Sequence, residues 1–459
     1  MSNILYLVHK KRFDYSFGMY LSKFHHVTFM TSDPMVGLFL DAQHAAPEYL
    51  YKVEPVQLKK RKDPSIQQIL EQTTAYRLST DVQVKEALYA LCVGYVQFLR
   101  KYLVNNKISI IITTARHFLD ISCITAVANE LKLPVCYLSS GFFRRASCGL
   151  SFEPPKPDNP EVWGKRHRNE EDRLVIPVRS VPEVTFDLVS IKKTNPFLTL
   201  WQNARYQRNP FWQSRHPDST PTDSLLNHLK KQLLKAVGYD LPGQSSTALP
   251  EEFVFLPLQG NEVFERMGYP MGLSGMEQLT TYVALGLQAA NEYRDSTLKL
   301  VVKEHPAEPG IISTEFKRQH PNILFLRKYP IGELLDKAKL VVTFSSLAGF
   351  EALQRYKPVI TFAPCFYTLP QLVYCCDDLD SLSILINDAL GKGCDQQAVD
   401  AFVLFVKTHF EVPCLGFNRS NPTIAMFRKI HGRIEGLLDY AQSYDVYPAS
   451  WASHGEDCS

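Results

Sequence analysis

The sequence predicts an α/β protein in which two Rossmann-like domains face a central cleft. Short apolar runs that end in polar residues alternate with segments of helical period, and the pattern starts again after residue 246. Such alternation is typical of βα units around a parallel sheet. The chain has 459 residues, of which 45% are hydrophobic, so it can form two sizeable cores.

The first domain is assigned to residues 1–245. Apolar runs bounded by polar residues predict its strands, and apolar periodicity predicts its helices. The expected strands are 4–8, 26–30, 109–113 and 134–138, and the expected helical regions are 66–104 and 118–131. Prolines recur through about 153–215, which predicts a loop-rich insertion.

The second domain is assigned to residues 246–430, with the end of a C-terminal helix and a tail over 431–459. The expected strands are 253–258, 298–302, 322–326, 340–344 and 358–362, and the expected helices are 276–293, 332–338, 347–355, 396–408 and 422–440. Two Rossmann-like domains around a cleft make up the architecture called GT-B.

Composition excludes several classes of protein. A net charge of +3 does not indicate a nucleic-acid partner. Basic clusters such as Lys59–Lys62 are interpreted as a solvated surface, and the alternative is a site for an anionic lipid headgroup or an acidic glycan. The ten cysteines form no CxxC pair, which favours free thiols in a reducing compartment. No run of 18 apolar residues and no signal peptide is present, so we expect a cytoplasmic protein, with peripheral attachment to the inner membrane left open.

The strongest candidate site is a strand that runs into a helix at Ser345 and Ser346. Free N–H groups and a positive dipole end there would suit a phosphate, although serine is also an ordinary helix cap. Gly349 would permit close approach of a ligand. Glu351, one turn into the helix, could accept ribose hydroxyls.

Two further strand ends carry polar residues on the same predicted sheet. Lys303, His305 and Pro306 follow one strand, where cationic or N–H donors could stabilise a departing phosphate; a surface turn is the alternative. Another strand is followed by candidate ligands, for which loop capping is the competing interpretation: Gln259, Asn261 and Glu262. Ligands of open α/β sheets bind at the carboxyl ends of strands.

The first domain offers a facing set after its fourth strand. Gly141, Arg144, Arg145 and Glu153 follow that strand, and Arg116 follows the one before it. An arginine fork pairs with a carboxylate or a phosphate, while a solvated loop is the alternative. No Asp-x-Asp pair stands at a suitable strand end, so no metal ligands and no cofactor are expected for this site.

These motifs together resemble the bacterial capsule polysaccharide synthesis family. The resemblance covers most of 105–375 and rests on Gln259 after Pro-Leu, Lys303 with His305-Pro306, Ser345-Ser346 with Gly349, the Lys357-Pro358 to Pro370 stretch, and Gly141-Phe142-Phe143-Arg144 with Glu153. Arg145 stands where that family usually has proline. Asn261-Glu262 stands near the place of a common aspartate.

The resemblance implies a glycosyltransferase that moves Kdo (3-deoxy-D-manno-octulosonic acid) from a CMP donor, a co-substrate, to a glycolipid or polysaccharide acceptor. His305, Ser345 and Ser346 would then hold the donor phosphate, Glu351 the ribose, and Arg116 or Arg144 the sugar carboxylate. Retention, the preferred outcome, needs Glu262 or Glu153 as nucleophile; inversion needs one of them as base. The alternatives are a transferase for CMP-sialic acid or a UDP-sugar, and a non-catalytic glycan- or lipid-binding member of an export assembly.

Overall fold

The computed structural model describes two compact units, and each is treated by itself. Among the described residues, unit 1 combines those within 1–151 and 179–186 with those from Thr408 onward, and unit 2 holds those within 248–407. The described residues are 1–9, 11–56, 63–73, 76, 79–114, 118–143, 147–151, 179–186, 248–261, 263, 264, 267, 269–305, 310–327, 329–409, 411–413 and 423–443.

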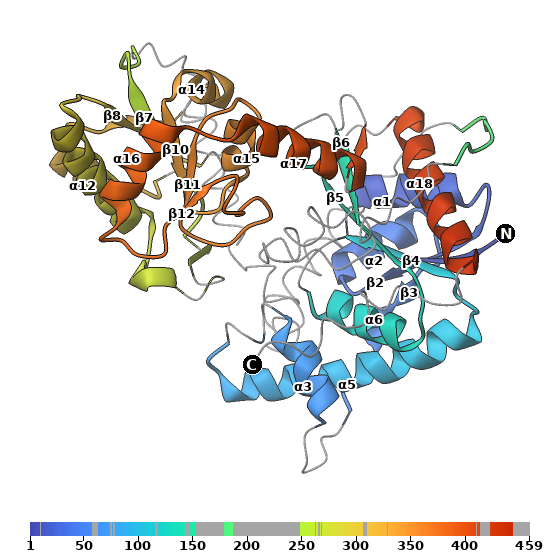
Figure 1. The fold of residues 1–459 in the computed structure, drawn as a ribbon. Coiled ribbons are helices and arrows are strands. Elements are labelled where there is room, and N and C mark those ends of the chain that lie inside the picture. Colours follow the sequence, from blue (N-terminus) through green and yellow to red (C-terminus); the bar gives the residue numbers. More distant parts are fainter. Residues whose placement is uncertain are drawn as a thin grey trace. The chain divides into compact units, whose positions relative to one another are not determined.

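Unit 1 is built on a seven-stranded sheet in the order β13-β6-β5-β4-β1-β2-β3 (Figure 1). The strands from β3 to β5 are parallel, and β6 and β13 extend the sheet in antiparallel pairing. The strands are β1 (Asn3–Leu7), β2 (His26–Thr31), β3 (Glu48–Tyr49), β4 (Ile110–Thr114), β5 (Val135–Ser140), β6 (Ser147–Ser151) and β13 (Glu411–Pro413).

Helices cover both faces of this sheet because alternate side chains of the central strand point in opposite directions. Leu5 and Leu7 of β1 belong to the cluster that includes α5 and α6, whereas the ring of Tyr6 lies 6.2 Å from that of Phe17 on α1. The helices are α1 (Lys11–Leu21), α2 (Pro34–Ala42), α3 (Pro64–Glu71), α5 (Val82–Asn105), α6 (Leu119–Glu130) and α18 (Ile424–Ser443), with a 3-10 turn η1 at Leu50–Lys52.

Unit 2 is built on a six-stranded, fully parallel sheet in the order β12-β11-β10-β7-β8-β9. Its strands are β7 (Phe253–Pro257), β8 (Lys299–Lys303), β9 (Leu324–Leu326), β10 (Leu340–Thr343), β11 (Val359–Thr361) and β12 (Tyr374–Cys375). Its helices are η3 (Pro270–Gly272), α12 (Met276–Arg294), α13 (Thr314–Gln319), α14 (Ile331–Lys337), α15 (Leu347–Leu353), α16 (Leu382–Lys392) and α17 (Gln396–His409). Val254 and Leu256 of β7 pack in one core with the buried faces of α12 and α16, which lie side by side (Figure 1).

The structure confirms the expected two Rossmann-like α/β domains, each built on a largely parallel sheet. Two such domains are what the GT-B architecture consists of. Two assignments differ from the sequence analysis. The region 66–104 is two helices, α3 and α5, each begun by an aspartate cap, Asp63 and Asp81. The segment from Thr408, including β13 and α18, packs into unit 1, although residues up to 430 were assigned to the second domain.

Residues 153–178 and 187–215 of the proline-rich insertion lie outside the described residues, and the cleft between the domains stays a prediction. Within the part of the chain that the structure describes, every helix is too short or too polar to cross a bilayer.

Candidate functional site at the switch point of the second sheet

The carboxyl edge of the unit 2 sheet has a topological switch point between β7 and β10. The chain runs from β7 outward to β8 and β9, then returns to β10 on the other side of β7 and continues to β11 and β12. In sequence order within the unit this is the arrangement 3-2-1-4-5-6, which leaves a crevice where the two central strands diverge. The predicted motifs after β7, β8 and β10 therefore lie at one edge of one sheet.

A hydrogen bond joins the two sides of the switch point. The Ser345 N–H, after β10, donates to Oε1 of Gln259, after β7, at 2.9 Å. The next amide, Ser346 N–H, donates to the Thr343 hydroxyl at 3.2 Å. The sequence analysis placed Gln259 and Ser345 together as ligands, and the structure brings them into direct contact.

Ser346 is the cap of α15. Its hydroxyl accepts from the Ala348 N–H at 3.3 Å, and its carbonyl oxygen accepts from the Tyr367 hydroxyl. The helix has seven residues, so the alternative interpretation as an ordinary helix cap describes what the serine does here.

Gly349 makes room for a tyrosine. A Cβ atom at this position would lie 2.7 Å from Cζ of Tyr367, whose side chain is fully buried. Burial raises the pKa of the Tyr367 hydroxyl, which therefore stays a neutral donor to Ser346. The sequence analysis expected a ligand to approach Gly349, whereas in the structure the group that lies closest to it is Tyr367 of this chain.

Replacing Gly349 by alanine should destabilise unit 2, because the Tyr367 ring would have to move within a packed core. We expect a loss of about 1–3 kcal/mol, measured as a lower midpoint of urea unfolding. Because part of the clash is with the hydroxyl, the added change Tyr367→Phe should recover part of that loss. An unchanged midpoint in Gly349→Ala would contradict this account.

Glu351 lies on the buried side of α15. Its residue exposure is 8%, and its carbonyl oxygen accepts from Arg355 Nη1 at 2.7 Å. A ribose could reach this carboxylate only if the surrounding side chains made way, so its expected contact with the donor stays a prediction.

The segment after β8 is anchored by Glu304, a residue that the sequence analysis did not single out. Glu304 is 3% exposed, pairs with Lys317 on α13 and accepts from the Gly310 N–H at 3.4 Å. Lys303 Nζ lies 3.4 Å from the Glu304 carbonyl oxygen. The signal available in the sequence was the position of Glu304 directly after an apolar strand, because an acid that is buried there needs a partner. Glu304 thereby holds the backbone from which His305 projects.

A cavity of about 420 Å³ opens beside this segment, between the connections that follow β7 and β8. Oδ1 of Asn261 accepts from the Met276 N–H at 3.0 Å and thus caps α12, whereas the competing role foreseen for it was capping of the loop after β7. The cavity is lined by Asn261, Ser274–Gln278, Gly310, Ile311 and Ser313.

In unit 1, the predicted segment after β5 is held by the C-terminal part of the chain. The Phe142 N–H, next to Gly141, donates to Oε1 of Glu411 on β13 at 2.7 Å, and Glu411 is 2% exposed. Six predicted site residues lie outside the described residues, and their roles stay predictions: Arg116, Arg144, Arg145, Glu153, Glu262 and Pro306.

A polar cluster at the carboxyl edge of the unit 1 sheet was missed by the sequence analysis. His9, after β1, has Nε2 3.6 Å from Oδ2 of Asp120 at the start of α6, and the same oxygen accepts from the Ser32 hydroxyl after β2. The other oxygen of Asp120 accepts from the Ile121 N–H at 2.9 Å. Because β1 and β4 flank the switch point of this sheet as well, the cluster stands where such sheets bind ligands. A His, a Ser and an Asp far apart in sequence gave no local signal.

Comparison with known proteins points to one family. The family model described as "Capsule polysaccharide biosynthesis protein" matches residues 274–375. This segment carries the capsule-family signature. The resemblance expected from the motifs is confirmed over these residues, which include Lys303, His305, Ser345, Ser346 and Gly349. The match covers 102 of the 459 residues and supports a link of this segment to capsule polysaccharide biosynthesis.

Other similarities are weaker or more distant. Protein FixF of Sinorhizobium fredii (strain NBRC 101917 / NGR234) is 29% identical over 132 residues, which are 28% of this chain and 31% of FixF. Among solved structures, KpsC of Thermosulfurimonas dismutans, a beta Kdo 2,4 transferase, aligns with 71% of this chain and 87% of its own at 16% identity and a TM-score of 0.35. UDP-GlcNAc 2-epimerase of Neisseria meningitidis aligns with 96% of this chain and 100% of its own at 11% identity and a TM-score of 0.34.

Proposed function

We propose that this protein is a metal-independent glycosyltransferase that moves an acidic sugar, Kdo, from CMP to a glycolipid or polysaccharide acceptor. The observation that carries the proposal is the family match over 274–375, because that stretch holds the motifs that end at the switch point of the second sheet. The Gln259–Ser345 hydrogen bond supports it, since it fixes the two sides of the crevice in which a donor would lie.

The donor phosphate would lie at the carboxyl edge of unit 2. His305 would donate to a phosphate oxygen as the bond to the sugar breaks, because negative charge grows there in the transition state. The Ser345 hydroxyl would add a neutral donor. The Glu304–Lys317 pair would hold the loop so that the His305 donor need not reorganise during the reaction.

Unit 1 would supply the proton acceptor for the acceptor hydroxyl. His9 has an acidic neighbour, Asp120, which can orient the imidazole and stabilise it once it is protonated. In a retaining reaction, with Glu262 or Glu153 as nucleophile, this base would act in the second step, when the acceptor hydroxyl attacks the glycosyl–enzyme.

The proposal is tested by incubating purified protein with CMP-Kdo and candidate glycolipid acceptors and measuring acceptor-dependent CMP release. CMP-sialic acid and UDP-sugars, assayed in parallel, test the alternative donors. Release from CMP-Kdo alone among these would support the proposal. No release, together with no thermal shift on adding CMP, would overturn it and favour a non-catalytic glycan- or lipid-binding role.

Attachment to the inner membrane is part of the proposal, because a glycolipid acceptor would be presented there. Sedimentation of the protein with vesicles that contain anionic lipid tests this part separately from the transfer reaction.

A further inference from the structure

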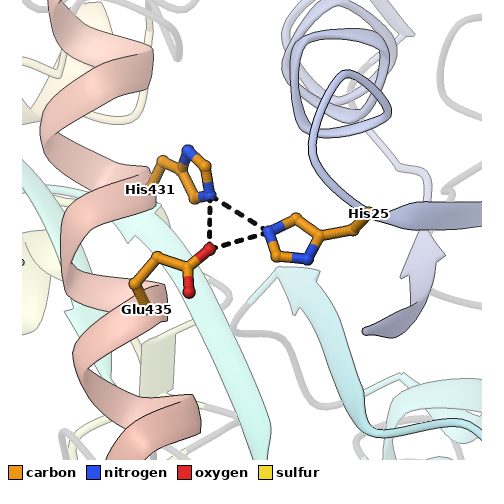
Figure 2. Close-up of side chains that lie close together, drawn as sticks. All are labelled: His25, His431 and Glu435. Carbon is orange, nitrogen blue, oxygen red and sulfur yellow. Dashed lines mark hydrogen bonds and ion pairs between the residues drawn. The ribbon is translucent and has the colours of Figure 1, made fainter. Parts of the chain in front are cut away.

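Two buried histidines and a glutamate converge at the amino edge of the unit 1 sheet (Figure 2). His25 directly precedes β2, whereas His431 and Glu435 lie one turn apart on α18. Oε1 of Glu435 is 2.8 Å from Nε2 of His25 and 2.8 Å from Nε2 of His431, and the two Nε2 atoms are 3.1 Å apart. Three potential ligand atoms from segments distant in sequence therefore point at one place.

The two histidines of the cluster are buried, whereas the glutamate is partly exposed. His25 is 7% exposed and His431 is 1% exposed, while the Glu435 side chain is 28% exposed. A cavity of about 600 Å³ adjoins all three residues, and its other walls are Met1, Ser2, Phe24, Arg179–Pro182, Leu438 and Asp439. The cavity leaves room for water beside the three donors.

We propose that His25, His431 and Glu435 bind one divalent first-row transition-metal ion, with water from the adjoining cavity completing its coordination. Imidazole nitrogen and carboxylate oxygen are the donors that such ions take in proteins. No metal was expected from the sequence at the transfer site, and this site is a different one.

The spacing of the three donor atoms matches that of three ligands around one ion. With bonds of about 2.05 Å, an ion would lie about 1.2 Å outside the plane of the donor atoms, at donor–ion–donor angles of about 86°, 86° and 98°. Angles near 90° are those of three ligands on one face of an octahedron, as in two-histidine, one-carboxylate sites. The remaining positions then point away from the three side chains.

Both histidines present Nε2 to the cluster, the nitrogen that a metal ion would take. In the metal-free protein the two Nε2 atoms lie 3.1 Å apart, and the ring tautomers decide which of them donates to the other or to Glu435. Metal binding would place each ring proton on Nδ1. For His25 this ends the 3.4 Å contact in which Nδ1 accepts from the Ser2 N–H, and for His431 Nδ1 is buried without a hydrogen-bond partner among the described residues.

The ion would join the C-terminal helix α18 to the segment that precedes β2. Phe427 lies one turn before His431 on α18, and its ring is 5.2 Å from Phe17, 5.6 Å from Tyr20 and 5.8 Å from Phe13, all on α1. A metal ion bound by both His25 and α18 would add a second and stronger connection to this apolar contact. Since the site lies at the amino ends of β1 and β2, opposite to the edge that carries His9, the ion would take no part in sugar transfer.

The test uses the full chain, purified without a histidine tag and treated with a chelator, and titrates it with Zn²⁺ and Co²⁺ by calorimetry. We expect one high-affinity ion per chain and a higher unfolding temperature in the presence of excess metal, because an ion that binds only the folded chain stabilises it. His431→Gln should weaken binding at least about 100-fold, the upper end of what the loss of an outer-shell partner costs.

Two further variants separate a loss of metal binding from a loss of folding or of an unrelated histidine. Glu435→Gln retains an oxygen that accepts from both rings, so it should fold as the parent does but bind metal poorly. His26→Gln removes an exposed histidine directly beside His25 and should bind metal as the parent does. Absence of a one-to-one site in the parent, or unchanged affinity in both His431→Gln and Glu435→Gln, would overturn the proposal.

Discussion

Replacing His305 by alanine should lower CMP release by about 10²–10³-fold, with both units still folded. The expected loss is that of one fixed donor to a group whose negative charge grows in the transition state. Because His305 follows β8 on a segment held by the buried Glu304, its removal leaves the anchoring pair with Lys317 intact. The measurement is kcat/KM for acceptor-dependent CMP release, with circular dichroism as the check on folding.

The matched control for this change is His320→Ala. His320 also belongs to unit 2, but it follows α13 and its ring lies 4.3 Å from that of Phe316, on the approach to β9. It should leave turnover within a factor of about 2, since substitutions away from such sites usually change little. Normal turnover in His305→Ala would remove this residue from the site.

Replacing His9 by glutamine should lower steady-state turnover by about 10²–10⁴-fold, the usual contribution of a positioned general base. If transfer is retaining, the first half of the reaction does not need this base. The variant should then release about one CMP per chain in a rapid phase and continue slowly, because the glycosyl–enzyme waits for a deprotonated acceptor. Rapid-quench measurement of CMP separates the two phases.

Asp120→Asn tests whether the carboxylate acts through His9. It removes the charge next to the imidazole while an amide oxygen can still accept from the Ser32 hydroxyl. We expect a lower kcat with an unchanged affinity for CMP, and no further loss when it is combined with His9→Gln. An Asp120→Asn variant that matches the parent, or an additive loss in the double variant, would show that the cluster only ties the loops together; His26→Gln serves as the neutral histidine control.

Much of the fold could be predicted from local sequence because the signals are local. The apolar run from Phe253 to Leu258 and the β-branched pair at Val301-Val302 lie within buried parallel strands, where continuous apolar runs are needed. The start of α12 at Met276 and of α15 at Leu347 followed from apolar periodicity and, for α15, from its serine cap.

For the candidate site, the sequence indicated the strand ends that carry polar residues but not which of those residues touch. The order of strands could be anticipated only as a parallel sheet, yet it is the return of β10 to the side of β7 that joins Gln259 to Ser345. Gly349 was expected to admit a ligand, whereas the group that lies against it in the structure is Tyr367, 18 residues further along the chain.

The sequence by itself determined the two α/β domains, the strand ends that carry polar residues, and the likeness of one segment to capsule polysaccharide biosynthesis proteins. Only the tertiary structure decided that α18 packs on α1 in the first unit and that His25 meets His431 across 406 positions of sequence. It also decided that His9, Ser32 and Asp120 share one edge. Secondary structure follows from periodicity over a few residues, whereas these contacts follow from which apolar faces bury one another, and a helix such as α18 could have covered either sheet with the same local pattern.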